Sequence, residues 1–254
     1  MKHLLTLSFI LVLISAKAQR ATPDTFETND GDLTIQPIVH GTLALGWKDQ
    51  TIYVDPYGGA EKFDGLKAPT LILITDIHGD HYNEKTLEAL DTKRAKFIVP
   101  QAVYDKMPEN IQAQSIVLGN GQTIVFEGME ILAMPMYNLP EDEESRHTKG
   151  RGNGYVLTIG GKRIYLSGDT EDIPEMRNLQ NIDVAFVCMN LPYTMSVDQA
   201  ASAVNEFKPR IVYPYHYRGQ GGLSDVESFK AQVNAESPEV EVRLRDWYGE
   251  KSNQ

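Results

Sequence analysis

Residues 71–81 read Leu-Ile-Leu-Ile-Thr-Asp-Ile-His-Gly-Asp-His, an apolar run followed at once by a dense group of polar side chains. The four consecutive apolar residues from Leu71 to Ile74 predict a fully buried strand. A loop that leaves a buried strand is a rigid place from which to present functional side chains. This stretch therefore predicts a functional site at the end of a core strand.

The polar residues of this stretch have the chemistry of metal ligands. Asp76, His78 and Asp80 alternate with two other residues, so an extended turn can direct all three side chains into one space. His81 points elsewhere and can serve a neighbouring ion. Carboxylate and imidazole together suit Zn²⁺, Mn²⁺ or Fe²⁺. The alternative is a polar turn with solvated acids and one core histidine, and four potential ligands within six residues argue against it.

Short β-rich runs dominate the rest of the chain, and helices lie between some of them. Ser196 with Gln199 and Ser224 with Glu227 both fit capping boxes that open helices of about three turns. The strands are predicted at residues 33–38, 42–47, 51–54, 70–74, 96–99, 123–126, 130–133, 155–159, 163–166, 184–187 and 210–213.

Two segments of the chain share a hairpin rhythm. Residues 43–55 form a hairpin pattern that ends on an acid, and residues 156–169 repeat it, with turns expected at Asp49-Gln50 and Gly160-Gly161. Each hairpin is followed by an apolar strand that leads into a histidine, His78 in one case and His216 in the other. Two similar halves, each a sheet with helices on one side, would bury their sheets against each other.

The cluster at residues 76–81 resembles the His-x-His-x-Asp-His signature of the metallo-β-lactamase superfamily, with Asp76 in place of the first histidine. The resemblance extends over the whole mature chain and is greatest to the ascorbate-phosphate-lactonase-like branch of metal-dependent hydrolases. In that branch the N-terminal hairpin opens with a histidine and ends in Asp-Pro, as at His40 and Asp55-Pro56 here. The resemblance implies an α/β (α+β) fold, a four-layer αββα sandwich of two similar halves.

The resemblance also implies the remaining ligands. Residues 146–156 resemble the segment that carries the third histidine, His147, although this stretch could instead bind substrate. Residues 166–170 resemble the Gly-Asp motif of the bridging aspartate, Asp169, and residues 213–217 the strand end with the last histidine, His216. One metal would then take His78 and His147, with Asp76 as a further candidate, and another Asp80, His81 and His216, with Asp169 between them. We therefore expect two divalent ions per chain.

Such a site implies hydrolysis by a metal-bound hydroxide. A bound divalent metal can bring the pKa of its water from about 15.7 to about 7. Asp80 would orient the hydroxide and His78 would hold the metal, so these two residues are the predicted catalytic pair. The anionic Asp76 makes the site more electron-rich than a histidine would and shifts the preference towards Mn²⁺ or Fe²⁺. Asp76 can equally lie outside the set of direct ligands.

Basic and aromatic residues flank the predicted ligands. Arg151 and Arg218, with Tyr193, are candidates for binding a small anionic substrate through its carboxylate or phosphate group. The alternative for the arginines is a set of solvated loop charges. His40 is a further substrate-binding candidate, and a structural hydrogen bond inside the fold is its alternative.

Three functions are compatible with these residues. The first is hydrolysis of an ester, lactone or phosphodiester. The second is redox chemistry at a di-iron centre, which the absence of a flavin module disfavours. The third is a metal-binding module without activity, against which seven candidate ligands argue.

The N-terminus has the three parts of a secretory signal. A basic start at Lys2 precedes the apolar run 4–14 and the small-x-small exit at 16–18, so cleavage is expected after Ala18. Removal of residues 1–18 takes away two lysines and no acids, and the formal charge moves from −11 to −13.

We expect an exported, periplasmic or secreted protein with a flexible stretch over residues 19–31 and one hydrolase domain over 32–254. Its acidity disfavours nucleic acid as a partner, and no stable membrane insertion is expected after cleavage. The sequence specifies no oligomeric state.

Overall fold

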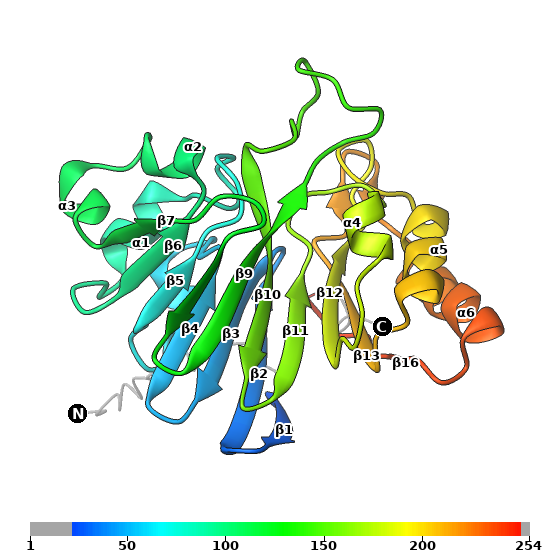
Figure 1. Cartoon of the computed structure of the whole chain (residues 1–254), viewed down its shortest axis with the longest axis horizontal. Coiled ribbons are helices and arrows are strands. Elements are labelled where there is room, and N and C mark those ends of the chain that lie inside the picture. Colours follow the sequence, from blue (N-terminus) through cyan, green and yellow to red (C-terminus); the bar gives the residue numbers. More distant parts are fainter. Residues whose placement is uncertain (1–21, 250–254) are drawn as a thin grey trace, which may run out of the picture.

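The computed structural model describes residues 22–249, so the predicted signal peptide lies outside the described residues. Two seven-stranded sheets form the centre of the molecule (Figure 1). The first contains, in spatial order, β1 (Asp24–Thr28), β2 (Gly31–Val39), β3 (Thr42–Trp47), β4 (Gln50–Val54), β5 (Leu71–Leu73), β6 (Lys96–Val99) and β7 (Ser115–Val117). The second contains β16 (Glu241–Val242), β13 (Ile211–Tyr215), β12 (Val184–Cys188), β11 (Lys162–Leu166), β10 (Gly152–Ile159), β9 (Met129–Met136) and β8 (Thr123–Phe126). A separate pair consists of β14 (Arg218–Gly219) and β15 (Gly222–Leu223).

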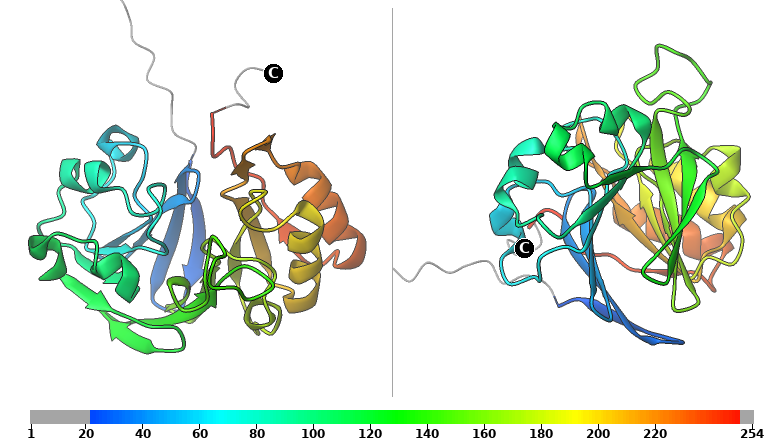
Figure 2. Two further views of the ribbon diagram at one scale, coloured as in Figure 1. Left: turned by 90° about the horizontal axis from the view of Figure 1, so that it is seen from above. Right: turned by 60° about the vertical axis from the view of Figure 1, so that its left-hand side comes forward.

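Helices cover the outer face of each sheet, which gives the four αββα layers that the sequence predicted (Figure 2). The first sheet carries η1 (Ala60–Phe63), α1 (Glu84–Ala89), α2 (Gln101–Tyr104) and α3 (Glu109–Gln112). The second carries α4 (Pro174–Arg177), α5 (Val197–Phe207) and α6 (Val226–Glu236). None of the described helices has the length and apolar character needed to cross a bilayer.

The two halves have the same topology. In the first sheet β1 to β4 are antiparallel and β4 to β7 are parallel neighbours. In the second, β8 to β11 are antiparallel, and β11, β12, β13 and β16 are parallel neighbours. The sequence analysis treated the strand before His216 as the counterpart of the strand before His78. This is wrong, because the counterpart of β5 in the second sheet is β12, whereas His216 follows β13.

The buried strands explain why the sequence shows unbroken apolar runs. Leu71 and Leu73 of β5 belong to the core between the sheets, whereas Ile72 and Ile74 belong to the core under the helices of the first sheet. Successive side chains of a strand point to opposite faces, so a strand covered on both sides needs apolar residues throughout. The loop that follows β5 is therefore fixed to a rigid element.

Turn and cap chemistry agrees with the sequence in part. Gly160 and Gly161 form the predicted two-residue turn with φ of 53° and 81°. In the first hairpin Trp47 pairs with Gln50, so the turn is Lys48-Asp49 and not Asp49-Gln50.

The helix starts show the same mixture of agreement and correction. Ser196 forms its capping box with Gln199. The cap of α6 is Asp225 rather than Ser224, since the Asp225 carboxylate accepts from Ser228 N while Ser224 Oγ donates to Met189 O.

The stretch predicted to be flexible is structured from Asp24 onward. β1 pairs antiparallel with β2, and the Asp24 carboxylate accepts hydrogen bonds from the Arg245 guanidinium and from Tyr213 Oη. For the described residues 22–31 the prediction was wrong, because their polar composition gives no sign of the partners that come from the other end of the chain.

Candidate metal centre

The predicted ligands converge at one edge of the two sheets. The segment after β5 carries residues 76–81, Asp169 follows β11, His216 follows β13, and His147 lies in the loop between β9 and β10. That loop projects beyond the sheets at the top of Figure 1. Sites in open α/β sheets form at the carboxyl ends of parallel strands, and three of these four segments leave such ends.

Asp169 lies at the centre of three histidines. Its Oδ2 atom is 3.3 Å from His81 Nε2 and 3.2 Å from His147 Nε2, and its Oδ1 atom is 3.5 Å from His216 Nε2. The rings of His81 and His216 are stacked at 4.9 Å. All four side chains are buried. One carboxylate thus faces ligand-type nitrogens on both of its oxygens.

The inward-facing atoms of this group lack hydrogen-bond partners among residues 22–249. Nε2 of His81, His147 and His216 and Oδ1 of Asp169 are all buried and unsatisfied. Buried polar atoms are nearly always paired, so four together require an explanation. Imidazole nitrogen and carboxylate oxygen are ligands for divalent transition metals, and this donor set therefore fits such an ion.

The ligand atoms fall into three groups, and the group of His40, Asp80 and His216 shares His216 with the second position described below. In the first position, Asp76, His78 and His147 offer atoms that all lie within 4.8 Å of one another. The second position, formed by His81, Asp169 and His216, meets the same condition. Asp169 Oδ2 also faces His147, so the two positions are adjacent.

Asp80 and His40 form the open side of the second position. Asp80 Oδ2 lies 3.4 Å from His216 Nε2 and 3.2 Å from His40 Nε2, and about a third of the Asp80 side chain is exposed. Burial opposes its ionisation, but the adjacent His216 imidazole and the hydrogen bond with His40 hold the pKa of Asp80 far below its ordinary value. His40 also packs its ring on His216 at 3.7 Å. His40 is thus part of the cluster, and its role in substrate binding stays a prediction.

Asp55 belongs to the site although the sequence reasoning assigned it no role. Its Oδ2 atom accepts from His81 Nδ1 at 2.8 Å and from Thr75 Oγ1 at 2.6 Å, and its Oδ1 accepts from Thr75 N at 2.8 Å. This arrangement turns His81 Nε2 towards Asp169. Although burial opposes protonation, Asp169 and Asp55 raise the pKa of His81 well above its ordinary value. The signal that could have identified Asp55 is an acid directly after a buried strand, followed by proline.

Tyr248 is a second residue that the sequence did not reveal. Its hydroxyl lies 2.7 Å from His40 Nδ1 and accepts from Arg218 N at 3.1 Å. The guanidinium of Arg218 lies over the Tyr248 ring at 4.4 Å. The predicted substrate residue Arg218 is therefore exposed beside His40, held by a tyrosine from the C-terminal segment.

The other predicted substrate residues lie in different surroundings. Arg151 donates to both oxygens of Asp76, through Nε at 3.2 Å and Nη2 at 3.0 Å. Tyr193 packs under the guanidinium of Arg146 at 4.3 Å, and its carbonyl accepts from Asn138. The structure thus places Arg151 among the ligands and gives Tyr193 a packing role in the neighbouring loops.

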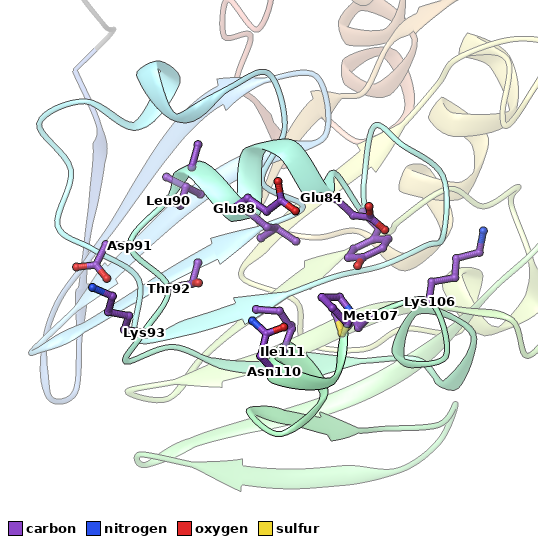
Figure 3. A pocket seen from close by; sticks show the side chains of 14 residues that line it. Glu84, Glu88, Leu90, Asp91, Thr92, Lys93, Lys106, Met107, Asn110 and Ile111 are labelled. Atoms are coloured by element: carbon purple, nitrogen blue, oxygen red, sulfur yellow. The ribbon is translucent and has the colours of Figure 1, made fainter.

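A separate pocket of about 730 Å³ lies in the outer helical layer, away from the cluster (Figure 3). Glu84, Lys106 and Met107 are among its lining residues, which come from segments 82–93 and 106–111. None of its lining residues belongs to the first or the second position.

Similarity to known proteins agrees with this chemistry. The chain matches the beta-lactamase superfamily domain over residues 34–216. A UPF0173 metal-dependent hydrolase of Thermococcus onnurineus is 31% identical over 192 residues, which cover 72% of this chain and 84% of that protein. Another, from Symbiobacterium thermophilum, is 27% identical over 229 residues and covers 87% of this chain and 92% of its own length.

Solved structures show the same architecture. A protein of Parabacteroides distasonis described as a metal-dependent hydrolase superposes with a TM-score of 0.79 at 38% identity and covers 89% of this chain and 99% of its own. Igni18, a metallo hydrolase of Ignicoccus hospitalis, has a TM-score of 0.70 at 24% identity, over 84% of this chain and 94% of that one. The chain therefore belongs to the metallo-β-lactamase superfamily and is a metal-dependent hydrolase.

Proposed function

We propose that the protein cleaves an ester, lactone or phosphodiester bond in a small anionic substrate with the help of two divalent ions, Zn²⁺, Mn²⁺ or Fe²⁺. The observation that carries this proposal is the position of Asp169, within 3.2–3.5 Å of nitrogens from three histidines. A carboxylate shared in this way suits two adjacent cations. When bound, such ions acidify water and withdraw electrons from a carbonyl or phosphoryl oxygen.

The chain supplies a carboxylate that can accept a hydrogen bond from the attacking water and orient it. The Asp80 side chain is 33% exposed, whereas those of Asp76 and Asp169 are 0% and 4% exposed. The low pKa of Asp80 keeps it ionised near neutral pH. His40 and His216 fix its Oδ2 atom, so its orientation is set before the substrate arrives.

The arginine at the open side of the cluster supports an anionic substrate. Arg218 is exposed and stacked on Tyr248 next to His40, and the guanidinium fork matches carboxylate and phosphate groups. The chain as a whole has a formal charge of −11, so an exposed arginine beside the cluster is opposite in sign to the net charge of the protein. An arginine at this place can bind the carboxylate or phosphate group of a small substrate.

We also propose that the protein is exported from the cytoplasm. The basic start, the apolar run 4–14 and the exit at Ala16-Lys17-Ala18 support cleavage after Ala18 and a mature protein in the periplasm or the medium. N-terminal sequencing of protein from the exporting cell should give Gln19 as the first residue. An intact Met1 in the soluble product would refute export by this signal.

The hydrolytic reaction is tested with a panel of esters, lactones and phosphodiesters, with Mn²⁺ or Zn²⁺ supplied. Asp80→Asn should lower kcat by about 10²-fold on any substrate that the wild type cleaves, because the amide does not orient the attacking water as the carboxylate does. Asp91→Asn, a change at an exposed acid, is the matched control. Hydrolysis of no substrate by the metal-loaded protein would instead support a metal-binding module without activity.

A further inference from the structure

The carboxylate that replaces the expected histidine has a cationic partner. Asp76 is fully buried, and Arg151 donates to both of its oxygens from a side chain that is 20% exposed. Asp76 Oδ2 also lies 2.6 Å from His78 Nδ1. The guanidinium thus occupies the outer side of the first position and competes for the lone pairs of Asp76.

The backbone fixes this pair in place. Asn153 N donates to Thr75 O at 2.9 Å, which aligns the segment before β10 with the segment before Asp76. A Cβ atom on Gly152 would lie 2.8 Å from Thr75 O, so the absence of a side chain at Gly152 permits this close approach. Arg151 is consequently held beside Asp76 by main-chain contacts and not by its side chain alone.

In the second position the group that contacts a ligand from outside is a carboxylate instead of a guanidinium. Asp55 accepts from His81 Nδ1 at 2.8 Å and is itself buried. A carboxylate behind a ligating imidazole raises the basicity of that imidazole and strengthens metal binding. A guanidinium behind a carboxylate does the reverse, because its charge repels a cation and its hydrogen bonds occupy ligand oxygens.

We propose that these opposite charges make the two metal positions unequal, so that the position of His81, Asp169 and His216 fills first. The position of Asp76, His78 and His147 then fills only at higher metal concentration, and Arg151 sets the difference. This inference rests on the two-metal arrangement proposed above. It is tested by metal binding alone, so a failure to find a substrate does not affect the outcome.

The wild-type protein can be titrated with Mn²⁺ after chelation and followed by electron paramagnetic resonance. Sequential filling predicts the spectrum of isolated Mn²⁺ up to one equivalent, and the spectrum of an exchange-coupled pair only beyond it. A coupled pair present from the first substoichiometric addition would overturn the proposal, since it would show that the positions fill together.

Calorimetric titration of variants assigns the difference to Arg151. Arg151→Met should raise the Mn²⁺ affinity of the weaker position by about 10-fold or more and leave the tighter one unchanged. Arg151→Lys keeps the charge and should keep the two affinities apart. Arg146→Met, in the same loop but stacked on Tyr193, is the matched control.

Two results of the variant titrations would contradict the role of Arg151. One is an unchanged weaker affinity in folded Arg151→Met protein, and the other is an equal rise at both positions. If Arg151→Met does not fold because Asp76 is left buried and unpaired, the wild-type titration decides by itself.

Discussion

Asp55 controls a ligand without belonging to the predicted ligand set. It accepts from His81 Nδ1 and from two donors of Thr75, and it follows directly after β4. Asp55→Asn should reduce metal affinity by about 10–100-fold, because His81 loses the group that orients it and raises its basicity. Asp49→Asn, at an exposed turn of the same hairpin, is the control. Equal metal affinities for the two variants in a competition with a fluorescent chelator would refute this role.

The residue pattern by itself revealed those site residues that are close together along the chain, whereas His147, Asp169 and His216 were named through the family resemblance. Asp76 to His81 form one segment after a buried strand, so their convergence follows from local geometry. The pairing of Asp76 with Arg151 spans 75 residues, and that of His40 with Tyr248 spans 208. Such contacts depend on how the two sheets align, which no local pattern records.

A glycine in β10 permits a close approach to the end of β11 beside the site. A Cβ atom on Gly154 in β10 would lie 2.8 Å from Ser167 O and 2.9 Å from Leu166 O, directly before Asp169. Gly154→Ala should therefore lower the free energy of unfolding by about 1–3 kcal/mol, since backbone atoms cannot move aside easily. Gly79→Ala has open space around the added methyl group and is the control. Denaturant curves that coincide for the two variants would contradict this prediction.

The C-terminal segment 243–249 closes one side of the cluster. Trp247 is buried against Phe186 and Tyr215, and this anchor places the Tyr248 hydroxyl on His40. Tyr248→Phe should lower kcat by about 10-fold, because His40 loses the group that orients it towards Asp80. Its thermal stability should fall only slightly, by the equivalent of about one hydrogen bond.

Trp247→Ala serves as the contrast for this segment. Loss of its indole should cost about 3–5 kcal/mol of unfolding free energy, because it leaves a cavity in the core. If Tyr248→Phe retained wild-type kcat on the substrate found, the hydroxyl would have no role in positioning His40.

Elements were predictable where pattern and chemistry agreed locally. Ser196 with Gln199 identified the start of α5, and Gly160-Gly161 identified a hairpin. β1 was missed because its sequence, Asp-Thr-Phe-Glu-Thr, is polar and its stability depends on pairing with β2 and on Arg245 from the far end of the chain. Strands at a sheet edge are specified by such distant partners more than by their own composition.

The cluster also links metal binding to the stability of the whole molecule. Despite the opposing effect of burial, Asp169 and Asp55 raise the pKa of His81 in the metal-free protein, and His216 and His81 lower that of Asp169. A histidine with a raised pKa stabilises the fold below its ordinary pKa of about 6.5, and this contribution is lost as the pH rises through the folded-state value. The carboxylate contribution of Asp169 is present above its ordinary pKa and is lost in acid.

The chelated protein should therefore melt at progressively lower temperature as the pH rises above about 6.5 and through the raised pKa of His81, because neutral His81 no longer balances Asp169. A bound divalent ion replaces the lost positive charge, so the gain in Tm from added Mn²⁺ should increase over the same range. Thermal unfolding with and without Mn²⁺ measures this gain, and a gain that stays constant or shrinks with rising pH would contradict the prediction.

The central claim is that His81, His147, Asp169 and His216 converge to hold metal at the shared edge of the two sheets. Anomalous diffraction from crystals grown with Mn²⁺ tests it most directly, because it locates the ions without reference to any substrate. We predict anomalous peaks within bonding distance of His81 Nε2, His216 Nε2 and Asp169, and at high metal concentration a second peak beside His147 Nε2. Peaks confined to surface carboxylates, with none at Asp169, would contradict the account.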